Sequence, residues 1–255
     1  MGWSSPIVWG AKVFVTSADS DQTTKQPSLG VDFSNDYVAE LMKEGKTEEE
    51  VEALVTARDT ELPDEVELSY RLHCIDLESG QILWERDFHH GSPPVGRHRK
   101  NSYTSETPVT DGERVYVYIA FLGLFAFDFE GNQLWSTPLK PNKVYFDFGS
   151  GASPALYGNQ LFILNDNEEE SYVAAFDKRT GEPLWRIVRS GIGSEQMKSG
   201  WSTPFVWEND QRTEIVTVGP GAVISYGLDG AELWRMGRMS MMSIQTPFSW
   251  EGLLY

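Results

Sequence analysis

The chain has 255 residues, of which 40% are hydrophobic and 13% aromatic, so it can bury a core and is neither disordered nor collagen-like. Its 21 basic and 38 acidic side chains give a net charge of −17, which disfavours nucleic acid and anionic lipid as partners, because both bind through lysine and arginine. The single cysteine, Cys74, excludes an internal disulfide, and the sequence contains neither a membrane-spanning run nor a recognisable signal peptide.

The first predicted unit covers residues 1–84, and the insertion 19–67 separates its second strand from its third. Within the insertion, residues 37–44 have a helical pattern that stops at Gly45, and Thr47 with Glu50 forms a capping box before a second helix. The insertion carries 15 acidic and 4 basic side chains, a net of −11, so most of the acidity lies here. We expect an acidic helical hairpin, which is either a solvated decoration of a blade loop or an element that binds a partner.

Three of the four histidines follow the first unit, in a predicted connection that is also basic. Adjacent histidines seldom converge on one ion, and Asp87 is the one carboxylate within sequence reach, so a metal site is disfavoured. An anionic ligand or partner, or simply an ordered polar loop, is the alternative. The candidate residues are His89, His90, Arg97, His98, Arg99 and Lys100.

Four later segments repeat the pattern of the first: 105–135, 151–185, 201–234 and the beginning of another unit at 244–255. A Gly-x-x-Leu-Trp segment or a close variant ends each complete unit, with steps of 51, 50 and 49 residues between the tryptophans. A Ser-Pro or Thr-Pro pair precedes each copy. The second unit contains four short strands of alternating apolar residues, with turns at Asp111-Gly112 and Glu130-Gly131.

A four-stranded unit of this kind cannot bury both of its faces alone, so the copies must pack on one another. Radial stacking of four-stranded antiparallel sheets is a β-propeller, with one repeat per blade. A β-sandwich is the other architecture we considered, but its strands would not recur in groups of four at a fixed step. The sequence therefore predicts an all-β propeller of about four complete blades and the start of a fifth, with a small helical insertion.

Two segments match a specific motif: Cys74-x-Asp76-x-x-Ser79-Gly80-x-x-x-Trp84 and Ala175-x-Asp177-x-x-Thr180-Gly181-x-x-x-Trp185. Both resemble the tryptophan-docking motif of pyrroloquinoline-quinone (PQQ) enzyme propellers. Two further copies are shorter, and the last has lost its aspartate. The motif residues are Asp76, Gly80, Trp84, Asp128, Gly131, Trp135, Asp177, Gly181, Trp185, Gly230 and Trp234. The resemblance implies a PQQ-like repeat protein, and it leads us to expect that the chain is part of a longer ring of seven or eight blades.

The motif also has a physical basis. A turn glycine can adopt positive φ, the aspartate can accept turn N–H groups, and a small first residue leaves room for an indole between blades. All nine tryptophans occupy repeat positions, which favours packing over ligand stacking. Cys74 takes the small-residue position, so we interpret it as a buried residue rather than a reactive thiol.

Other polar segments carry weaker signals. The acidic run 166–170 is expected to be a solvated turn, with calcium as the alternative, since it lacks the spacing of an EF-hand. The methionines at 236, 239, 241 and 242 are expected to line a core or channel, with copper as the alternative. No Ser/His/Asp arrangement and no phosphate-binding loop is recognised.

Two functions remain open at this stage. The first is a non-catalytic binding or scaffold module of an exported, periplasmic or otherwise extracytoplasmic bacterial protein. It would bind a protein partner or small ligand at the propeller face and need no cofactor. The alternative, implied by the resemblance, is a fragment of a PQQ- and calcium-dependent alcohol or sugar dehydrogenase. Such enzymes typically stack the quinone on a vicinal disulfide, and this chain has one cysteine.

Overall fold

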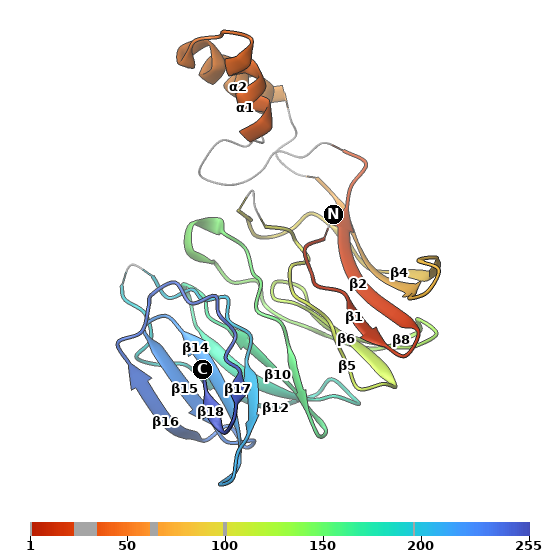
Figure 1. Ribbon diagram of the computed structural model, residues 1–255, viewed down its shortest axis with the longest axis vertical. Helices are drawn as coiled ribbons and strands as arrows, with labels where there is room; N and C mark the ends of the chain where they lie inside the picture. The colour runs from red at the N-terminus through yellow and green to blue at the C-terminus, as the bar shows by residue number, and fades with distance from the viewer. Residues whose placement is uncertain (1, 23–34, 62–65, 99–100, 196) are drawn as a thin grey trace.

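The computed structural model describes residues 2–22, 35–61, 66–98, 101–195 and 197–255. In these residues the strands form four four-stranded antiparallel sheets and one two-stranded hairpin, which follow one another as the blades of a partial propeller (Figure 1). The predicted all-β propeller class is confirmed. In every four-stranded sheet, strands adjacent in the sequence are hydrogen-bonded neighbours.

The sheets follow the order of the repeats. The first contains β1 (Ile7–Trp9), β2 (Lys12–Asp19), β3 (Leu68–Asp76) and β4 (Ile82–Gly91). The second contains β5 (Val109–Thr110), β6 (Arg114–Ile119), β7 (Gly123–Asp128) and β8 (Gln133–Pro138). The third contains β9 (Ala155–Tyr157), β10 (Gln160–Asn165), β11 (Tyr172–Asp177) and β12 (Pro183–Val188). The fourth contains β13 (Phe205–Glu208), β14 (Thr213–Gly219), β15 (Ala222–Tyr226) and β16 (Glu232–Gly237), and the hairpin contains β17 (Ser249–Trp250) and β18 (Leu253–Leu254).

The buried hydrophobic side chains of the described sheets form three clusters, each lying between two neighbouring sheets. Phe14 and Leu72 of the first sheet pack with Val117 of the second. The next cluster joins Tyr116 of the second sheet to Ile163 of the third, and the last joins sheets three and four. Because side chains alternate along a strand, β6 and β10 each bury one set of residues on either side. This two-sided burial explains why the inner strands are nearly continuous apolar runs.

The insertion forms the expected helical hairpin, with α1 (Asn35–Lys43) and α2 (Glu48–Glu61) above the end of the first sheet (Figure 1). Leu41 and Val51 are its buried apolar residues among the described side chains. The capping box is present: the Thr47 backbone N–H donates to Glu50 Oε2 at 2.8 Å, and the Glu50 N–H donates to Thr47 Oγ1 at 3.3 Å. The Thr47 N–H and, at 3.2 Å, the Thr47 hydroxyl both donate to Glu50 Oε2 and lower the pKa of this carboxyl group. The remainder of the predicted insertion, 23–34 and 62–65, lies outside the described residues.

The Ser-Pro and Thr-Pro pairs have a structural role that their sequence alone did not suggest. The Ser5 N–H donates to Thr107 Oγ1 at 3.0 Å, the Thr107 N–H to Ser153 Oγ at 2.9 Å, and the Ser153 N–H to Thr203 Oγ1 at 2.9 Å. Three such bonds join the first four pairs from blade to blade, which explains the hydroxyl residue before the prolines at 108, 154 and 204.

Candidate functional site

The tryptophans in the last strand of each of the first three sheets contact the following sheet. Trp84 Nε1 donates to the Phe129 carbonyl at 3.0 Å, Trp135 to the Lys178 carbonyl at 3.2 Å, and Trp185 to the Leu228 carbonyl at 2.9 Å. In every case the acceptor directly follows the position of the motif aspartate in the next sheet, which is Asp128, Asp177 or, where the aspartate is lost, Gly227. The contact thus runs in one direction along the chain.

The motif glycines are required by these indoles as well as by the turn. Gly131, Gly181 and Gly230 have φ of 84°, 76° and 87°, in the left-handed region that favours glycine. A Cβ at Gly131 would lie 3.0 Å from Trp84 Cδ2, and one at Gly230 would lie 2.9 Å from Trp185 Cδ2. A Cβ at Gly181 would collide with Trp135. Each glycine therefore leaves the space that the indole of the preceding blade occupies.

The motif aspartates hold the turns. Asp76 Oδ1 accepts the Ser79 N–H at 2.8 Å and its hydroxyl at 2.6 Å, and this hydroxyl is the largest contribution that lowers the pKa of Asp76. Asp177 Oδ1 accepts the Arg179 N–H at 2.7 Å. In the fourth turn, where Gly227 replaces the aspartate, Asp229 accepts the Ala231 N–H at 3.1 Å. The lost aspartate is thus replaced from within the turn.

The first glycine and the last tryptophan differ from the others. Gly80 has φ of 69°, but no atom lies within 4 Å of the place where its Cβ would stand. Trp234 Nε1 donates to Glu214 Oε2 of its own sheet at 2.7 Å instead of to a following turn. Cys74, opposite Trp84 in the sheet register, is fully buried, and burial raises the pKa of its thiol.

The histidines and basic residues do not converge. The prediction that His89 and His90 lie in a connection is wrong, because β4 continues to Gly91 along the long partner strand β3. His89 lies opposite Tyr70, with ring centres 5.3 Å apart, and burial lowers its pKa. His90 lies opposite Ser69 on the other face, with Nε2 3.1 Å from Glu67 Oε2.

The remaining members of this group either contact nearby loop residues or lie outside the described residues. His98 packs its edge against Phe148 at 5.1 Å. Arg97 donates to the Asn101 carbonyl at 2.7 Å and stacks over Tyr103 at 5.2 Å. Arg99 and Lys100 lie outside the described residues. Nothing in this geometry brings the histidines together around one ion.

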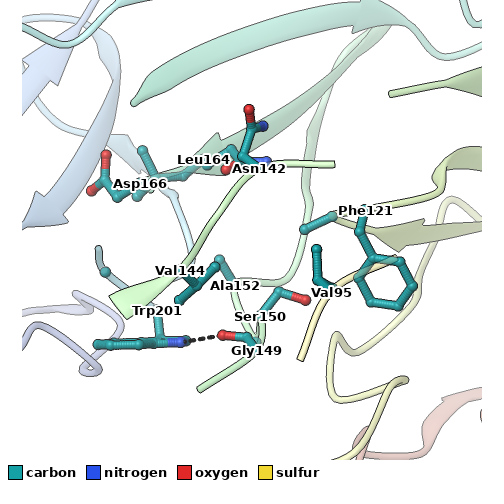
Figure 2. A pocket seen from close by; sticks show the side chains of 14 residues that line it. Val95, Phe121, Asn142, Val144, Gly149, Ser150, Ala152, Leu164, Asp166 and Trp201 are labelled. Carbon is teal, nitrogen blue, oxygen red and sulfur yellow. Dashed lines mark hydrogen bonds between the residues drawn. The ribbon is translucent and has the colours of Figure 1, made fainter. Parts of the chain in front are cut away.

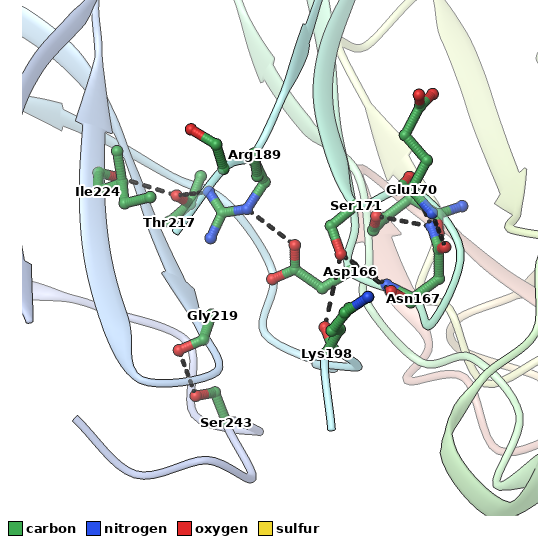
Figure 3. A network of polar contacts seen from close by, with 12 residues as sticks. Asp166, Asn167, Glu170, Ser171, Arg189, Lys198, Thr217, Gly219, Ile224 and Ser243 are labelled. Atoms are coloured by element: carbon green, nitrogen blue, oxygen red, sulfur yellow. Dashed lines mark hydrogen bonds and ion pairs between the residues drawn. The ribbon is translucent and has the colours of Figure 1, made fainter. Parts of the chain in front are cut away.

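A buried ion pair lies between the third and fourth sheets (Figure 3). Arg189 Nε donates to Asp166 Oδ1 at 2.8 Å, and both side chains are 0% exposed. Arg189 Nη1 reaches Thr217 Oγ1 at 2.5 Å and the Tyr226 hydroxyl at 3.2 Å in the neighbouring sheet. Burial raises the pKa of Asp166 to about 6, against the opposing pull of Arg189. Asp166 Oδ2 and Arg189 Nη2 have no hydrogen-bond partner among the described residues.

The acidic run 166–170 lies in the turn between β10 and β11, as predicted, but it is solvated only at Glu169 and Glu170, because Asp166 and Asn167 are buried. Glu168 Oε1 accepts the Lys198 and Ser199 N–H groups, both at 3.0 Å. Glu169 and Glu170 form ion pairs with Lys140 at 3.4 Å and with Arg186 at 2.6 Å. With Asp166 bound to Arg189, these oxygens point to different partners and do not form a calcium site.

Two hollows lie where the connections between the sheets meet. The first encloses about 20 Å³, the size of a single water site, between Val144, Ala152, Leu164 and Trp201 (Figure 2). Trp201 fixes one wall by donating to the Gly149 carbonyl at 2.7 Å. The second hollow is open, measures about 470 Å³, and shares Trp201 with the first. Its wall is completed by residues that include His98, Phe148, Met242 and Ile244.

The fully buried Glu106 stands beside the first hollow. Its Oε1 accepts the Ser150 hydroxyl at 2.5 Å and the Ala120 N–H at 3.2 Å, and both donor residues line that hollow. Burial raises the pKa of this carboxyl group. The methionine cluster is not a core, since Met236 and Met239 are 53% and 37% exposed, although Met242 lines the open hollow. The hollows thus combine an apolar wall with a few buried polar groups, as small binding sites do.

The sequence did not predict a further cluster of polar side chains, which lies on the first sheet. The Ser17 hydroxyl lies 2.9 Å from His73 Nε2, and His73 Nδ1 lies 2.8 Å from Glu85 Oε1. Arg71 on the same strand as His73 binds Asp87 at 2.5 Å. The insertion between Ser17 and His73 hides this cluster from a search for short motifs. Comparison of the repeats would have found it, since His73 stands where the second sheet has Phe125.

The resemblance implies calcium beside a quinone, and calcium would need a group of oxygen ligands. Among the described residues, no three His, Cys, Asp or Glu side chains gather in a way that would hold a metal ion. The single cysteine is enclosed in the packing between the first two sheets. No helix in the described part of the chain is long and apolar enough to cross a membrane.

These features define a β-propeller of PQQ-like repeats, in which tryptophans and glycines join successive blades. The model of the family described as "Outer membrane protein assembly factor BamB" matches residues 68–237, which include most of all four sheets. The chain belongs to this family. No curated protein matches the chain.

Several solved structures are similar to it. BamB from Moraxella catarrhalis has a TM-score of 0.49 at 17% identity, covering 75% of this chain and 50% of its own. Quinohemoprotein alcohol dehydrogenase ADHIIG from Pseudomonas putida HK5 has a TM-score of 0.47 at 14% identity, covering 71% of this chain and 34% of its own. The quinohemoprotein alcohol dehydrogenase of Comamonas testosteroni has a TM-score of 0.46 at 16% identity, covering 74% and 37%. The chain therefore spans half or less of the length of these structures.

Proposed function

We propose that this protein is a binding or scaffold module that acts outside the cytoplasm in outer-membrane protein assembly and performs no quinone chemistry. The observation that carries the proposal is the family match over residues 68–237, because that family is described as an assembly factor. The chemistry of the described residues supports it, since the carboxylates and guanidinium groups of the central region are engaged with one another. Trp84, Trp135 and Trp185 bond the following blade and so act as structural links.

The open hollow around Trp201 is the proposed contact for a protein partner or small ligand. Met242 and Ile244 are 44% and 62% exposed on its wall, so an apolar side chain of a partner would bury them. Burial of apolar surface at about 25 cal/mol per Å² would supply the affinity, while polar atoms around the hollow orient the partner.

The test is binding of the purified full chain to a purified outer-membrane assembly complex, measured by biolayer interferometry. We expect Ile244→Asp to weaken binding by at least about 10-fold, because a carboxylate would have to be desolvated in the interface. Val188→Asp is the control, because Val188 is 50% exposed on β12 and is not among the residues that line the hollow. No binding by the wild-type chain, or equal binding by both variants, would refute the proposal.

The alternative is that the chain is part of a PQQ- and calcium-dependent dehydrogenase. Mixing the full chain with PQQ and Ca²⁺ and following dye reduction by alcohols and sugars tests it directly. Turnover that depends on both additives would replace the scaffold proposal. If neither PQQ nor Ca²⁺ shifts the melting temperature, the alternative loses its support.

A further inference from the structure

We propose that Phe146, at the tip of the connection between β8 and β9, is an anchor that inserts into an apolar pocket on a folded partner protein. That pocket would have a basic and an acidic side chain at its edge. This inference rests on the proposed scaffold function and deepens it, because it assigns a residue of this chain and a partner chemistry to the contact beside the open hollow.

The backbone at the tip lies in a region that most side chains avoid. Phe146 has φ of 46° and ψ of 31°, and the next residue, Asp147, has φ of 53°. This left-handed region crowds the Cβ of an L-residue, and a bulky ring seldom occupies it. Glycine would take the same conformation without strain. Strained residues of this kind cluster at binding sites, where the surrounding structure holds them in place.

Hydrogen bonds on both sides of the tip hold it in this conformation. Before the tip, the Tyr145 N–H donates to Ser199 Oγ at 2.9 Å. After it, the Phe148 carbonyl accepts the His98 N–H at 3.1 Å and the Asn101 side-chain amide at 2.9 Å. The connection, which is the short green coil in Figure 1, is therefore held in shape before a partner binds. Such preorganisation lowers the entropy that binding costs.

The ring of Phe146 is displayed to the outside. It is 50% exposed, and its ring contacts are with Tyr145 at 4.3 Å and Phe148 at 6.1 Å between centres, both in the same connection. The two sheets that this connection joins are the second and third of the chain, and each has a further sheet beyond it, so the exposure does not arise at an end of the chain. A half-exposed aromatic ring on a fixed backbone has the properties of an interface anchor, since aromatic residues are enriched where proteins meet.

The anchor stands next to the open hollow. Phe148, two residues after Phe146, lines that hollow together with Trp201, and the centres of these two rings are 6.3 Å apart. An exposed ring and a hollow of about 470 Å³ are thus presented side by side. A partner with a pocket and a protruding apolar side chain would match both, so that the two contacts form one interface.

Charges beside the tip indicate what kind of partner it fits. Lys143 and Asp147 are exposed on either side of Phe146, and neither side chain forms a hydrogen bond or ion pair with the described residues. An apolar centre with a charged rim is the usual anatomy of a protein interface, and a rim of both signs would be met by an acidic and a basic side chain of the partner. A membrane is disfavoured, because Asp147 and the net charge of −17 would be repelled by anionic lipid.

Replacing Phe146 by glycine in the full chain tests the anchor, with binding to the purified outer-membrane assembly complex measured by biolayer interferometry. We expect Phe146→Gly to raise Kd by at least about 10-fold, as loss of an aromatic anchor does. Its melting temperature should stay within about 3 °C of the wild type, because relief of the left-handed strain offsets the lost ring contacts. Leu77→Ala is the control and should bind like the wild type, since Leu77 is 53% exposed in the turn between β3 and β4.

The outcomes separate this inference from the scaffold function. If Ile244→Asp weakens binding but Phe146→Gly binds like the wild type, the anchor is overturned and the scaffold function stands. A fall in melting temperature of more than about 10 °C in Phe146→Gly would show that the ring supports the loop, and would overturn the anchor too. So would binding to phosphatidylcholine vesicles that Phe146→Gly loses, because the tip would then contact a membrane. No binding of the complex by the wild type would refute both proposals.

Discussion

Replacing Trp185 by alanine tests whether the indoles hold the blades together. The substitution removes the hydrogen bond to the Leu228 carbonyl, 2.9 Å long, and the ring contact that Gly230 makes room for. Full burial of an indole of roughly 150–250 Å² contributes about 4–6 kcal/mol as an upper bound, and truncation of a packed tryptophan costs about 3–5 kcal/mol. For a chain of this size, that loss lowers the melting temperature by roughly 6–20 °C.

The assay is thermal and urea unfolding followed by circular dichroism, with Trp234→Ala as the matched control. Trp234 has the equivalent position in β16, but its Nε1 bonds Glu214 in its own sheet at 2.7 Å. Its loss removes a charge-assisted hydrogen bond without separating two blades, for which we expect about 1–3 kcal/mol. If Trp185→Ala leaves the melting temperature unchanged, or costs no more than Trp234→Ala, the docking argument is refuted.

Three further predictions follow from the same structure. Gly181→Ala should destabilise the fold by about 1–3 kcal/mol more than Gly80→Ala in urea unfolding, because both have positive φ but only the former would collide with Trp135; equal costs would contradict this. The pKa of Asp166 is raised from 3.8 to about 6, so its carboxyl contributes stability that is full below about pH 4 and lost as the pH rises through 6. Asp166→Asn should therefore reduce the fall in unfolding free energy between pH 4 and 7, and an unchanged slope would show that other groups cause it. Deleting residues 23–65 should leave the circular dichroism of the sheets and a cooperative melt intact, since the described core lies between the blades; loss of the cooperative melt would show that the insertion supports the first sheet.

The propeller was predictable because its physical cause recurs. Each blade needs a tryptophan, a turn glycine and a hydroxyl before proline, so the same residues return at a near-constant step. The Asp166–Arg189 pair was not predictable, because it joins two positions 23 residues apart that no local pattern connects, and Asp166 has no charged counterpart in the other repeats. His89 and His90 were misplaced because the length of β4 is set by its long partner β3, which begins directly after the helical insertion. The Ser17–His73 contact spans 56 residues, and only the register of β2 against β3 brings the two side chains together.

The one-way contact between a tryptophan and the next glycine has a consequence for how such a chain can grow. An interface that joins two different surfaces, one supplied by each blade, is heterologous, so any blade that carries both surfaces can be added without a new kind of contact. The contact itself therefore does not determine the number of blades. That number depends on the rotation between neighbouring sheets, which is set by packing of residues such as Val117 and Ile163. Substitutions that change the volume of these side chains are thus the changes that would alter ring size, while the tryptophans and glycines decide only whether blades join.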